Sequence, residues 1–472
     1  MADYDSFKKS IKEYAKAFSK IPSKETIRII GHLDADGICA SSIIINALIK
    51  LNRKYTLTIL PTLTEDSLKQ LKEENEKYFV FVDLGSGSLD YIGNIITDKT
   101  VYILDHHHPQ SNTNYNNIIQ INPHLFGIDG SEEISGSGVV FLFTQELVDN
   151  SEMSKIAIVG AIGDVQENNG FKKLNSEILD IAVKNNLIEI RKGLKFFGVQ
   201  TKPIHKLLQY STDIIIPDVT GSESGAINFL LSIGINPQTK KGWKKISDLT
   251  EQEKKKLVAA IVMRSSNKNP DTIFSNNYLL INEEENSPFR DAKEFATLLN
   301  SCGRLNKASI GIGACLNDKN MKKRAVENLS SYRKEIVNAI NWYKENPDKI
   351  IKKKNVIIIN AEENIIPTII GTLGSIISKS NDIEKNTFIL GLARNDDNTT
   401  KVSLRVSGNP DAVNLKDIIQ AIIEKAGNGS AGGHAFASGA VINTDYEDKF
   451  IDAAVNVLSN IDFENNTEVF LK

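Results

Sequence analysis

The stretch TVYILDHHH, residues 100–108, joins a short apolar run to an abrupt group of ionisable side chains. The apolar run stops at Asp105, and His106, His107 and His108 follow it, three of only 7 histidines in 472 residues. An uninterrupted run of this length, rich in β-branched and aromatic residues, is typical of a buried strand. The stretch therefore predicts a strand whose carboxyl end carries chemically active side chains.

Other parts of the first third of the chain repeat this pattern of an apolar run that stops at an acid or an imidazole. Three further predicted strands end in this way: residues 26–37 with His32, Asp34 and Asp36, residues 78–86 with Asp83, and residues 155–164 with Asp164. Helical patterns alternate with these runs, which predicts a parallel sheet with helices on both faces. Ligands of such sheets bind beyond the carboxyl ends of the strands, so we expect all four ends to meet in one crevice.

Carboxylates that share one crevice repel one another, by several kcal/mol at about 4 Å and a near-surface dielectric. Their pKa values must rise, or cations must lie between them. Carboxylates mixed with imidazoles suit Mn²⁺, Mg²⁺ or Zn²⁺, and a carboxylate that bridges two ions is typical of hydrolytic two-metal sites. A single Asp at a strand end is more often a helix cap or a turn residue, but four ends with the same chemistry favour a metal site. For His108 and His124 we favour structural roles.

The composition of the chain excludes some classes of protein. The net charge of -3 and the pI of about 6.2 argue against a broad basic surface that would bind nucleic acid by charge alone. The three cysteines, Cys39, Cys302 and Cys315, are too scattered for a disulfide framework or a zinc cluster. The first residues carry no apolar signal core, and no segment reaches the roughly 18 apolar residues of a membrane span. We expect a cytoplasmic protein without a membrane partner.

The order of the predicted elements indicates an α/β protein of three parts. Residues 1–190 are predicted to form the parallel-sheet domain with the metal site. Residues 191–345 are predicted to form a mostly helical middle region that ends in a connecting helix. Strands return in residues 346–472, which are predicted to form a smaller α/β domain. A chain of 472 residues is too long for one ordinary hydrophobic core, which agrees with several domains.

These segments resemble the motifs of a known family. The segments GHLDADG (31–37), VDLGSGS (82–88), LDHHHP (104–109) and GAIGD (160–164) resemble, in order and spacing, the four motifs of the DHH phosphoesterases. Residues 427–440, GNGSAGGHAFASGA, are similar to the Gly-Gly-His motif of the DHH-associated C-terminal domain. Residues 301–314, SCGRLNKASIGIGA, resemble the Cys-Gly-Arg segment of archaeal RecJ-like nucleases, the GINS-associated nuclease among them. The resemblance covers nearly the whole chain.

The resemblance implies a role for each side chain of the predicted metal site. His32 and Asp34 would bind a first divalent cation, and Asp36, His106 and Asp164 a second, with Asp83 bridging the two. His107 would contact the scissile phosphate, and Asp105 would hold a histidine in its metal-binding tautomer. The mixture of imidazole and carboxylate ligands favours Mn²⁺ over Mg²⁺.

A second group of candidate residues would bind the substrate. Gly432 and Gly433 would let backbone N–H groups approach a phosphate closely, and His434 and Ser438 would add donors. Arg304 and Arg405 would bind phosphate through the two arms of the guanidinium group. A tight turn would also explain the two glycines, and a surface ion pair would also explain either arginine.

The resemblance implies a metal-dependent exonuclease that hydrolyses phosphodiester bonds of single-stranded DNA or RNA, in DNA replication or repair. GINS and the replicative helicase are the protein partners that it suggests. A first alternative is a phosphodiesterase for short oligonucleotides or cyclic dinucleotides, although the helical middle region favours longer substrates. A second alternative is a non-catalytic replisome scaffold, but such subunits lose metal ligands, and here every ligand position is filled.

Overall fold

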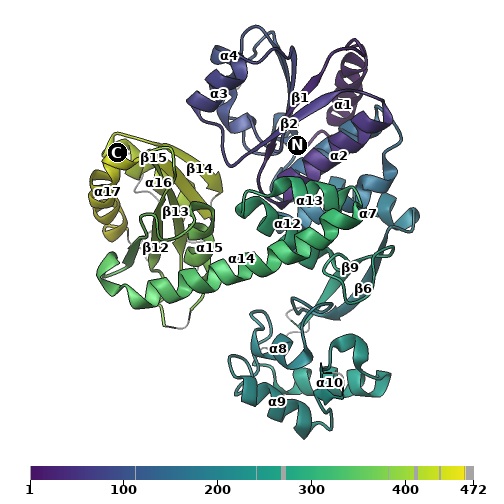
Figure 1. Ribbon diagram of the computed structural model, residues 1–472, viewed down its shortest axis with the longest axis vertical. Coiled ribbons are helices and arrows are strands. Elements are labelled where there is room, and N and C mark those ends of the chain that lie inside the picture. The colour runs from purple at the N-terminus through teal and green to yellow at the C-terminus, as the bar shows by residue number, and fades with distance from the viewer. Residues whose placement is uncertain are drawn as a thin grey trace. The chain divides into compact units, whose positions relative to one another are not determined.

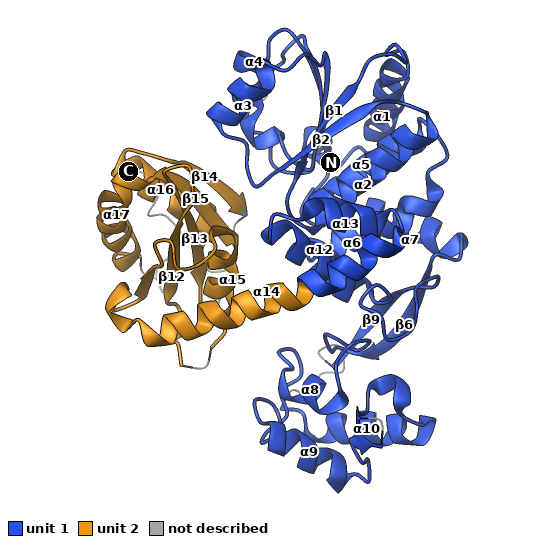
Figure 2. Ribbon diagram, in the orientation of Figure 1, with its two compact units in different colours: residues 1–328 blue, residues 329–472 orange. Residues whose placement is uncertain are grey.

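The computed structural model describes residues 2–111, 113–168, 170–240, 242–266, 273–380, 382–408, 413–434, 437–461 and 463. The chain divides into two compact units, Met1–Asn328 and Leu329–Lys472. Figure 1 shows their helices and strands, and Figure 2 colours the units separately. The division at Asn328 falls inside the middle region expected at 191–345, so the three-part boundaries stay a prediction.

A five-stranded parallel sheet forms the centre of the first unit, in the order β2-β1-β3-β4-β5. Its strands are β1 (Ile27–His32), β2 (Tyr55–Leu60), β3 (Tyr78–Val82), β4 (Thr100–Leu104) and β5 (Ile118–Ile121). The helices of this part are α1 (Tyr4–Phe18), α2 (Ala35–Lys50), α3 (Glu65–Lys72), α4 (Leu89–Ile95), α5 (Gly136–Gln145), α6 (Ser154–Gly163) and α7 (Lys173–Lys184). The predicted α/β fold with a parallel sheet is therefore confirmed.

Helices cover both faces of this sheet, which explains why its strands are apolar without interruption. Phe79 and Phe81 of β3 pack against α3 and α4 in one buried cluster. On the other face, the Tyr102 ring of β4 lies 5.2 Å from the Phe18 ring of α1, which in turn lies 5.5 Å from the Phe143 ring of α5. Alternate residues of each strand thus enter different cores, and the carboxyl ends of the strands stay open for a site.

The prediction of a strand at 155–164 was wrong, because residues 154–163 form the helix α6. This segment is apolar on every side and nearly all of it is buried. A fully buried helix has no polar face, so its hydrophobic pattern is indistinguishable from that of a buried strand. Asp164 still reaches the crevice, because it is the residue that ends α6.

A helical insert follows, carried by the antiparallel pair β6 (Ile188–Leu194) and β9 (Phe274–Leu280). It contains α8 (Ile204–Gln209), α9 (Glu223–Ser232), β7 (Gln238–Thr239), β8 (Gly242–Trp243) and α10 (Glu251–Arg264). The insert has its own buried cluster, which includes Leu208, Phe229 and Ile261. The chain then continues through α12 (Ala292–Arg304), α13 (Ala308–Cys315) and the long helix α14 (Lys319–Glu345).

The second unit contains a six-stranded mixed sheet in the order β10-β11-β12-β13-β15-β14. The strands are β10 (Ile350–Lys353), β11 (Val356–Asn360), β12 (Phe388–Arg394), β13 (Thr399–Val406), β14 (Ser430–His434) and β15 (Ala437–Asn443). The helix α15 (Pro367–Ser378) contacts β12 and β13, whereas α16 (Leu415–Ala426) and α17 (Glu447–Ser459) pack together in a buried cluster with the sheet. Short 3-10 turns lie at Ser86–Ser88, Pro123–Phe126, Ser151–Met153, Ile246–Asp248, Pro347–Lys349 and Thr444–Tyr446.

Among the described residues, no helix is both long enough and apolar enough to cross a membrane.

The sheet core predicts a large effect of truncating Phe81, whose side chain is fully buried. We expect Phe81→Ala to lower the free energy of unfolding by about 3–5 kcal/mol, because it removes buried apolar surface and leaves a cavity. Urea unfolding followed by circular dichroism measures this change. Tyr91→Ala is the matched control, since Tyr91 lies on α4 with 53% of its surface exposed, and equal effects of the two variants would contradict the assigned core.

Candidate metal centre

The loop between β1 and α2 presents the first acidic side chains. β1 ends at His32 and α2 begins at Ala35, and the Asp34 carboxylate caps α2 by accepting a hydrogen bond from the Gly37 N–H at 3.0 Å. Asp36, in the first turn of α2, is fully buried, whereas the side chains of His32 and Asp34 are 26% and 29% exposed. Asp34, which caps the helix, therefore lies at the solvent boundary, and Asp36, in the first turn of the helix, lies in the interior.

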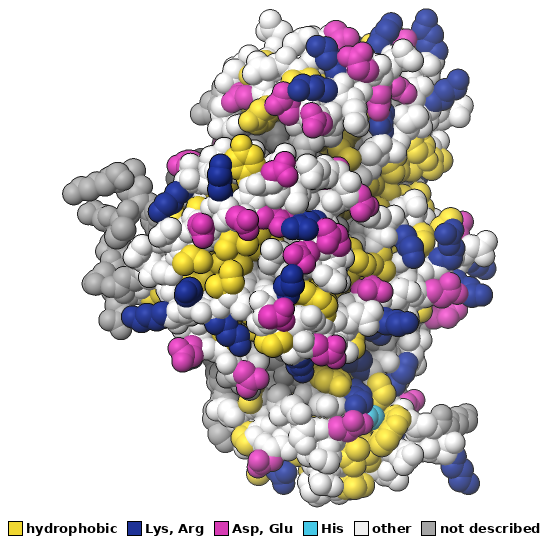
Figure 3. Space-filling model, turned by 60° about the vertical axis from the view of Figure 1, so that its left-hand side comes forward, with side chains coloured by type: hydrophobic (Ala, Val, Ile, Leu, Met, Phe, Trp, Pro, Cys, Tyr) yellow, Lys and Arg dark blue, Asp and Glu magenta, His cyan; other side chains and the backbone are white. Residues whose placement is uncertain are grey.

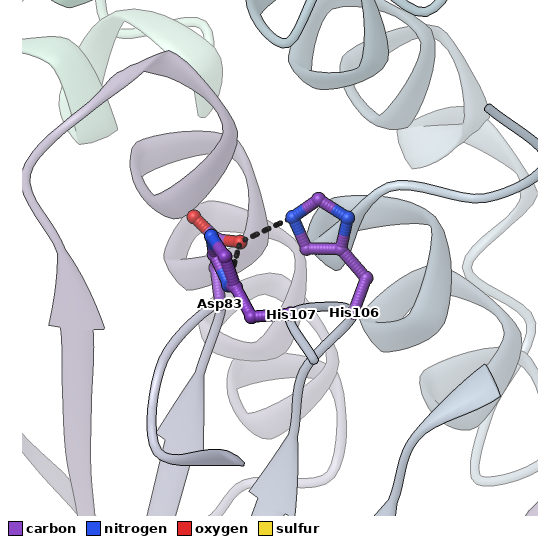
Figure 4. Close-up of side chains that lie close together, drawn as sticks. All are labelled: Asp83, His106 and His107. Atoms are coloured by element: carbon purple, nitrogen blue, oxygen red, sulfur yellow. Dashed lines mark ion pairs between the residues drawn. The ribbon is translucent and has the colours of Figure 1, made fainter. Parts of the chain in front are cut away.

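Asp83 directly follows β3, and its Oδ1 lies 3.3 Å from His106 Nε2 and 3.9 Å from His107 Nδ1 (Figure 4). Its backbone is left-handed, with φ of +58°, a conformation that Asp adopts more readily than most residues. Its N–H donates to the Leu104 carbonyl at 2.9 Å, which joins the ends of β3 and β4. The turn thus directs a carboxylate that is only 1% exposed into the space between the neighbouring strand ends.

Asp105 holds the turn after β4. One of its oxygens, Oδ1, accepts hydrogen bonds from the His106 N–H at 2.8 Å and the His107 N–H at 3.2 Å, and lies 2.7 Å from His107 Nδ1. The other, Oδ2, accepts from the Ser86 N–H at 2.9 Å. Burial opposes ionisation, but the histidines and these donors hold the pKa of Asp105 well below its ordinary value. Asp105 is therefore an anion that orients the His107 ring and holds the backbone of both histidines.

The structure brings together all six predicted metal-binding residues. His106 Nε2 lies 3.3 Å from Asp83 Oδ1, 3.2 Å from Asp164 Oδ2 and 3.9 Å from Asp36 Oδ2, and His32 Nδ1 lies 3.0 Å from Asp34 Oδ2 and 3.4 Å from Asp83 Oδ2. Three groups have all their ligand atoms within 4.8 Å of one another: His32 with Asp34 and Asp83, Asp36 with His106 and Asp164, and Asp83 with His106 and His107. Asp83 contributes to two of these groups, which suits a bridging carboxylate.

The unsatisfied atoms of this cluster fit metal ions. Both carboxylate oxygens of Asp83, His106 Nε2 and His32 Nδ1 are buried and make no hydrogen bond with the described residues. Buried polar atoms without a partner are rare in proteins, because leaving them unsatisfied costs about 1–3 kcal/mol each. These two carboxylate oxygens and two imidazole nitrogens form a donor set that divalent cations would satisfy.

The pKa shifts of the clustered residues also fit a site that attracts cations. Burial, reinforced by the Asp83 and Asp164 carboxylates, raises the pKa of Asp36 well above its ordinary value. Burial would lower the pKa of His32 and His106, but the neighbouring carboxylates outweigh it and raise both well above the ordinary value. In the absence of cations, protons therefore neutralise part of the clustered negative charge.

Ser137 is a residue of this site that the sequence reasoning missed. It lies in the first turn of α5, and its N–H donates to both carboxylate oxygens of Asp36 at 3.2 Å, while its hydroxyl donates to one of them. A helix N-terminus favours a negative charge. The signal in the sequence is the run Ser135 to Gly138, a helix cap followed by the small residues that form the first turn of an apolar helix.

Two glycines let the helices α5 and α6 approach the buried carboxylates. A Cβ atom at Gly136 would lie 2.3 Å from Asp83 Oδ1. A Cβ atom at Gly160 of α6 would lie 2.3 Å from Asp36 Oδ1 and 2.2 Å from the Ser137 hydroxyl oxygen. Each of these three contacts would force a side chain of the site to shift, so glycine at both positions preserves its geometry.

Helix α12 supports the loop that carries Asp34. The Asn300 side-chain oxygen accepts a hydrogen bond from the Ala35 N–H at 3.0 Å. A Cβ atom at Gly303 would lie 1.6 Å from the Leu33 carbonyl oxygen, so the backbone of α12 packs directly on the loop. The Cys-Gly-Arg segment thus lies beside the metal-site loop, and Arg304 is the last residue of α12.

The substrate candidates of the second unit lie on β13, β14 and β15. The Arg405 guanidinium donates from Nε to the Ser375 hydroxyl at 2.9 Å and from Nη1 to the Ser438 carbonyl at 3.3 Å. The Ser438 hydroxyl donates to the Leu415 carbonyl at 2.7 Å. Gly432 and Gly433 are exposed on the edge strand β14, and φ of +116° at Gly433 requires glycine.

The remaining histidines of the opening motif and its surroundings also have defined places. The rings of His108 and His124 stack on each other, with centroids 3.8 Å apart and an angle of 22° between their planes. The side chain of His434 lies outside the described part of the chain, although its backbone belongs to β14.

The close packing at Gly160 leads to a stability prediction. We expect Gly160→Ala to lower the free energy of unfolding by about 1–3 kcal/mol, because the new methyl group must displace Ser137 or Asp36. Chemical unfolding of the metal-free protein measures it. Gly87→Ala is the control, since a Cβ atom there meets no atom within 4 Å. Equal stability of the two variants would show that the packing around Asp36 is looser than described.

Comparison with known families assigns most of the chain. The model of the DHH family N-terminal domain matches residues 26–164, the DHH-CID domain matches residues 196–273, and the DHHA1 domain matches residues 353–460. An uncharacterized protein of Methanocaldococcus jannaschii is 32% identical over 432 residues, which cover 90% of this chain and 91% of that protein.

Solved structures share the fold at low sequence identity. RecJ from Thermus thermophilus in complex with Mn²⁺ gives a TM-score of 0.59 at 16% identity; the match covers 96% of this chain and 55% of that one. CDC45 from Entamoeba histolytica gives a TM-score of 0.65 at 12% identity, covering 96% and 99% of the two chains. A second structure, of exonuclease RecJ bound to manganese, gives 0.58 at 15% identity, covering 98% and 97%. The matched domains and the relative show that the chain belongs to the DHH family, and it shares its fold with the RecJ structures.

Proposed function

We propose that this protein is a metal-dependent phosphodiesterase that degrades single-stranded nucleic acid as an exonuclease. The observation that carries the proposal is the pair of ligand groups His32–Asp34–Asp83 and Asp36–His106–Asp164, with Asp83 Oδ1 only 3.3 Å from His106 Nε2 of the second group. The DHH family of the chain and the fold that it shares with the RecJ exonucleases also support a phosphodiesterase activity.

The six clustered residues are proposed to hold two divalent cations. His32, Asp34 and Asp83 would bind one ion, and Asp36, Asp83, His106 and Asp164 the other. Mn²⁺ is the first candidate and Mg²⁺ the second, which agrees with the manganese in two of the RecJ structures. When bound, such ions supply a hydroxide at neutral pH and stabilise the charge of the attacked phosphate.

His107 is the proposed contact to the scissile phosphate. Its ring is 30% exposed at the edge of the cluster, and Asp105 holds its Nδ1 at 2.7 Å. Burial would lower the pKa of His107, but Asp105 outweighs it and the pKa is raised. A protonated imidazole can donate a charge-assisted hydrogen bond to a phosphate oxygen through the nitrogen that Asp105 does not hold.

Arg304 of the first unit is a proposed phosphate contact, and so, separately, are Arg405 and the Gly-Gly-His segment of β14 in the second unit. Gly432 and Gly433 are exposed on the edge strand and, without side chains, would let a phosphate approach the backbone closely. His434 would add a donor. The Ser438 hydroxyl would have to leave the Leu415 carbonyl to contribute to the same site.

A role in DNA replication or repair, with GINS and the replicative helicase as partners, belongs to this proposal. The shared fold with CDC45 also supports a second candidate function, a non-catalytic replisome scaffold. The filled set of metal ligands favours the enzyme, because a scaffold has no need of buried carboxylates that repel one another.

The bridging role of Asp83 predicts a severe loss of hydrolysis in Asp83→Asn. Asn tolerates the left-handed backbone, but it removes the charge shared by both ligand groups, so we expect the rate to fall at least about a hundredfold. End-labelled DNA and RNA single strands of several lengths, digested with Mn²⁺ or Mg²⁺, measure the rate. Asp98→Asn is the control, because Asp98 is 61% exposed and precedes the amino end of β4.

The same digests separate the alternatives. Wild-type rates in Asp83→Asn would refute the assigned centre. A preference of the wild-type protein for dinucleotides would favour the short-substrate phosphodiesterase, and complete inactivity toward every strand would favour the scaffold.

Metal binding itself predicts a gain in stability that needs no substrate. A cation at 100 times its dissociation constant stabilises the folded state by about 2.7 kcal/mol. We expect Mn²⁺ to raise the midpoint of thermal unfolding of the wild-type protein and of Asp98→Asn, and to leave Asp83→Asn nearly unchanged. Equal shifts in all three proteins would place the bound metal elsewhere.

A further inference from the structure

His106 is held from behind by a backbone carbonyl. Its Nδ1 lies 2.7 Å from the Gly130 carbonyl oxygen, and its Nε2 faces Asp83 and Asp164. A carbonyl only accepts hydrogen bonds, so Nδ1 carries a proton and Nε2 is the nitrogen available to a cation. The direction of the Gly130 carbonyl therefore decides which imidazole nitrogen faces the metal centre.

The Gly130 carbonyl is in turn held by a buried chain of amides. Gln166 Nε2 donates to it at 2.9 Å, and Asn175 Nδ2 of α7 donates to Gln166 Oε1 at 2.7 Å. Gln166 and Asn175 are only 5% and 1% exposed. The Gln166 amide must have this orientation, because the reversed amide would place its oxygen against the Gly130 carbonyl oxygen.

Close packing leaves this carbonyl little freedom to move. A Cβ atom at Gly130 would lie 2.1 Å from the His106 carbonyl oxygen and 2.8 Å from His124 Nε2. The backbone at Gly130 therefore touches the backbone of His106 directly. With the position restricted by packing, the Gln166 hydrogen bond sets the direction of the carbonyl.

The backbone before Gln166 is strained in a way that agrees with a functional role. Val165, the second residue after α6, has φ of +61°. Hydrogen bonds run from the Val165 N–H to the Ile162 carbonyl and from the Gln166 N–H to the Ala161 carbonyl, both at 3.0 Å. This is the helix ending in which glycine is the usual residue. Val165 is 59% exposed, so packing of its own side chain does not explain the conformation. The turn places Asp164 toward the metal centre and Gln166 toward Gly130.

We propose that Gln166, supported by Asn175, is the positioning residue that keeps His106 in its metal-binding tautomer and orientation. The inference rests on the metal centre of the proposed function. Gln166 does not touch the proposed ligand atoms; it acts through the Gly130 carbonyl. Residues that orient metal-binding histidines in this way commonly change metal affinity 10–100-fold when they are replaced.

The test compares Mn²⁺ binding by wild type, Gln166→Glu and Gln145→Glu. Gln166→Glu keeps the acceptor for Asn175 but places a carboxylate oxygen against the Gly130 carbonyl. Gln145→Glu adds the same charge on α5, where the Gln145 side chain bonds to Asp149, Ser151 and the Asn150 N–H. Free Mn²⁺ is measured by electron paramagnetic resonance. We expect Gln166→Glu to bind Mn²⁺ about 10–100-fold more weakly and Gln145→Glu to bind as the wild type does.

A spectroscopic readout separates positioning from a general loss of structure. In the Mg²⁺-loaded protein, ¹⁵N NMR of the imidazoles should show His106 protonated at Nδ1 in the wild type and a changed Nδ1 signal in Gln166→Glu. If Gln166→Glu does not fold, Asn175→Asp replaces it, because that variant sets an acceptor against Gln166 Oε1 and should weaken Mn²⁺ binding in the same direction.

The outcomes are distinguishable. Wild-type Mn²⁺ affinity with an unchanged His106 signal in Gln166→Glu overturns the positioning role. A lower unfolding midpoint of the metal-free variant with unchanged Mn²⁺ affinity overturns it as well, since that result assigns Gln166 a purely structural role. If the wild-type protein binds no Mn²⁺, the metal centre of the proposed function fails, and the inference fails with it.

Discussion

Mutual repulsion among buried carboxylates is the constraint on which the rest of this structure depends. Asp36 and Asp83 are nearly inaccessible to water, and Asp164 lies beside them. Three kinds of compensation surround them: the imidazoles of His32 and His106, the hydrogen bonds from Ser137, and the N-terminus of α5. These groups leave several buried atoms unsatisfied, and divalent cations are the partners that the donor set suits.

The parallel sheet explains where the acids lie, and glycines explain how the surrounding helices reach them. Strand ends alone place Asp83 and the Asp105 turn beside the loop after β1. The helices α5, α6 and α12 then approach so closely that side chains are excluded at Gly136, Gly160 and Gly303. Asp105 and Gln166 orient the histidines from outside the cluster, so the donors are directed before any ligand arrives.

The fold and the buried side chains of this chain bear differently on its function. The RecJ exonucleases and CDC45 share the architecture with this chain at no more than 16% identity, so the fold alone does not decide between them. The side chains favour the proposed enzyme, because a buried cluster of charged, unsatisfied groups lowers the stability of a protein that binds no metal there. The buried amides of Gln166 and Asn175 also favour the enzyme, because through the Gly130 carbonyl they direct His106 Nε2 toward the acidic cluster.

The sequence by itself determined the parallel sheet and the acids and imidazoles at its edge, because buried strands are uninterrupted apolar runs and parallel strands share one carboxyl edge. It did not distinguish the helix α6 from a strand, because a helix buried on all sides lacks a polar face. Only the tertiary structure showed that Ser137 bonds to Asp36 and Asn300 to Ala35, residues 101 and 265 positions apart. Such contacts depend on how whole helices pack, and hydrophobic periodicity records which face of a helix is buried but not which residue it meets.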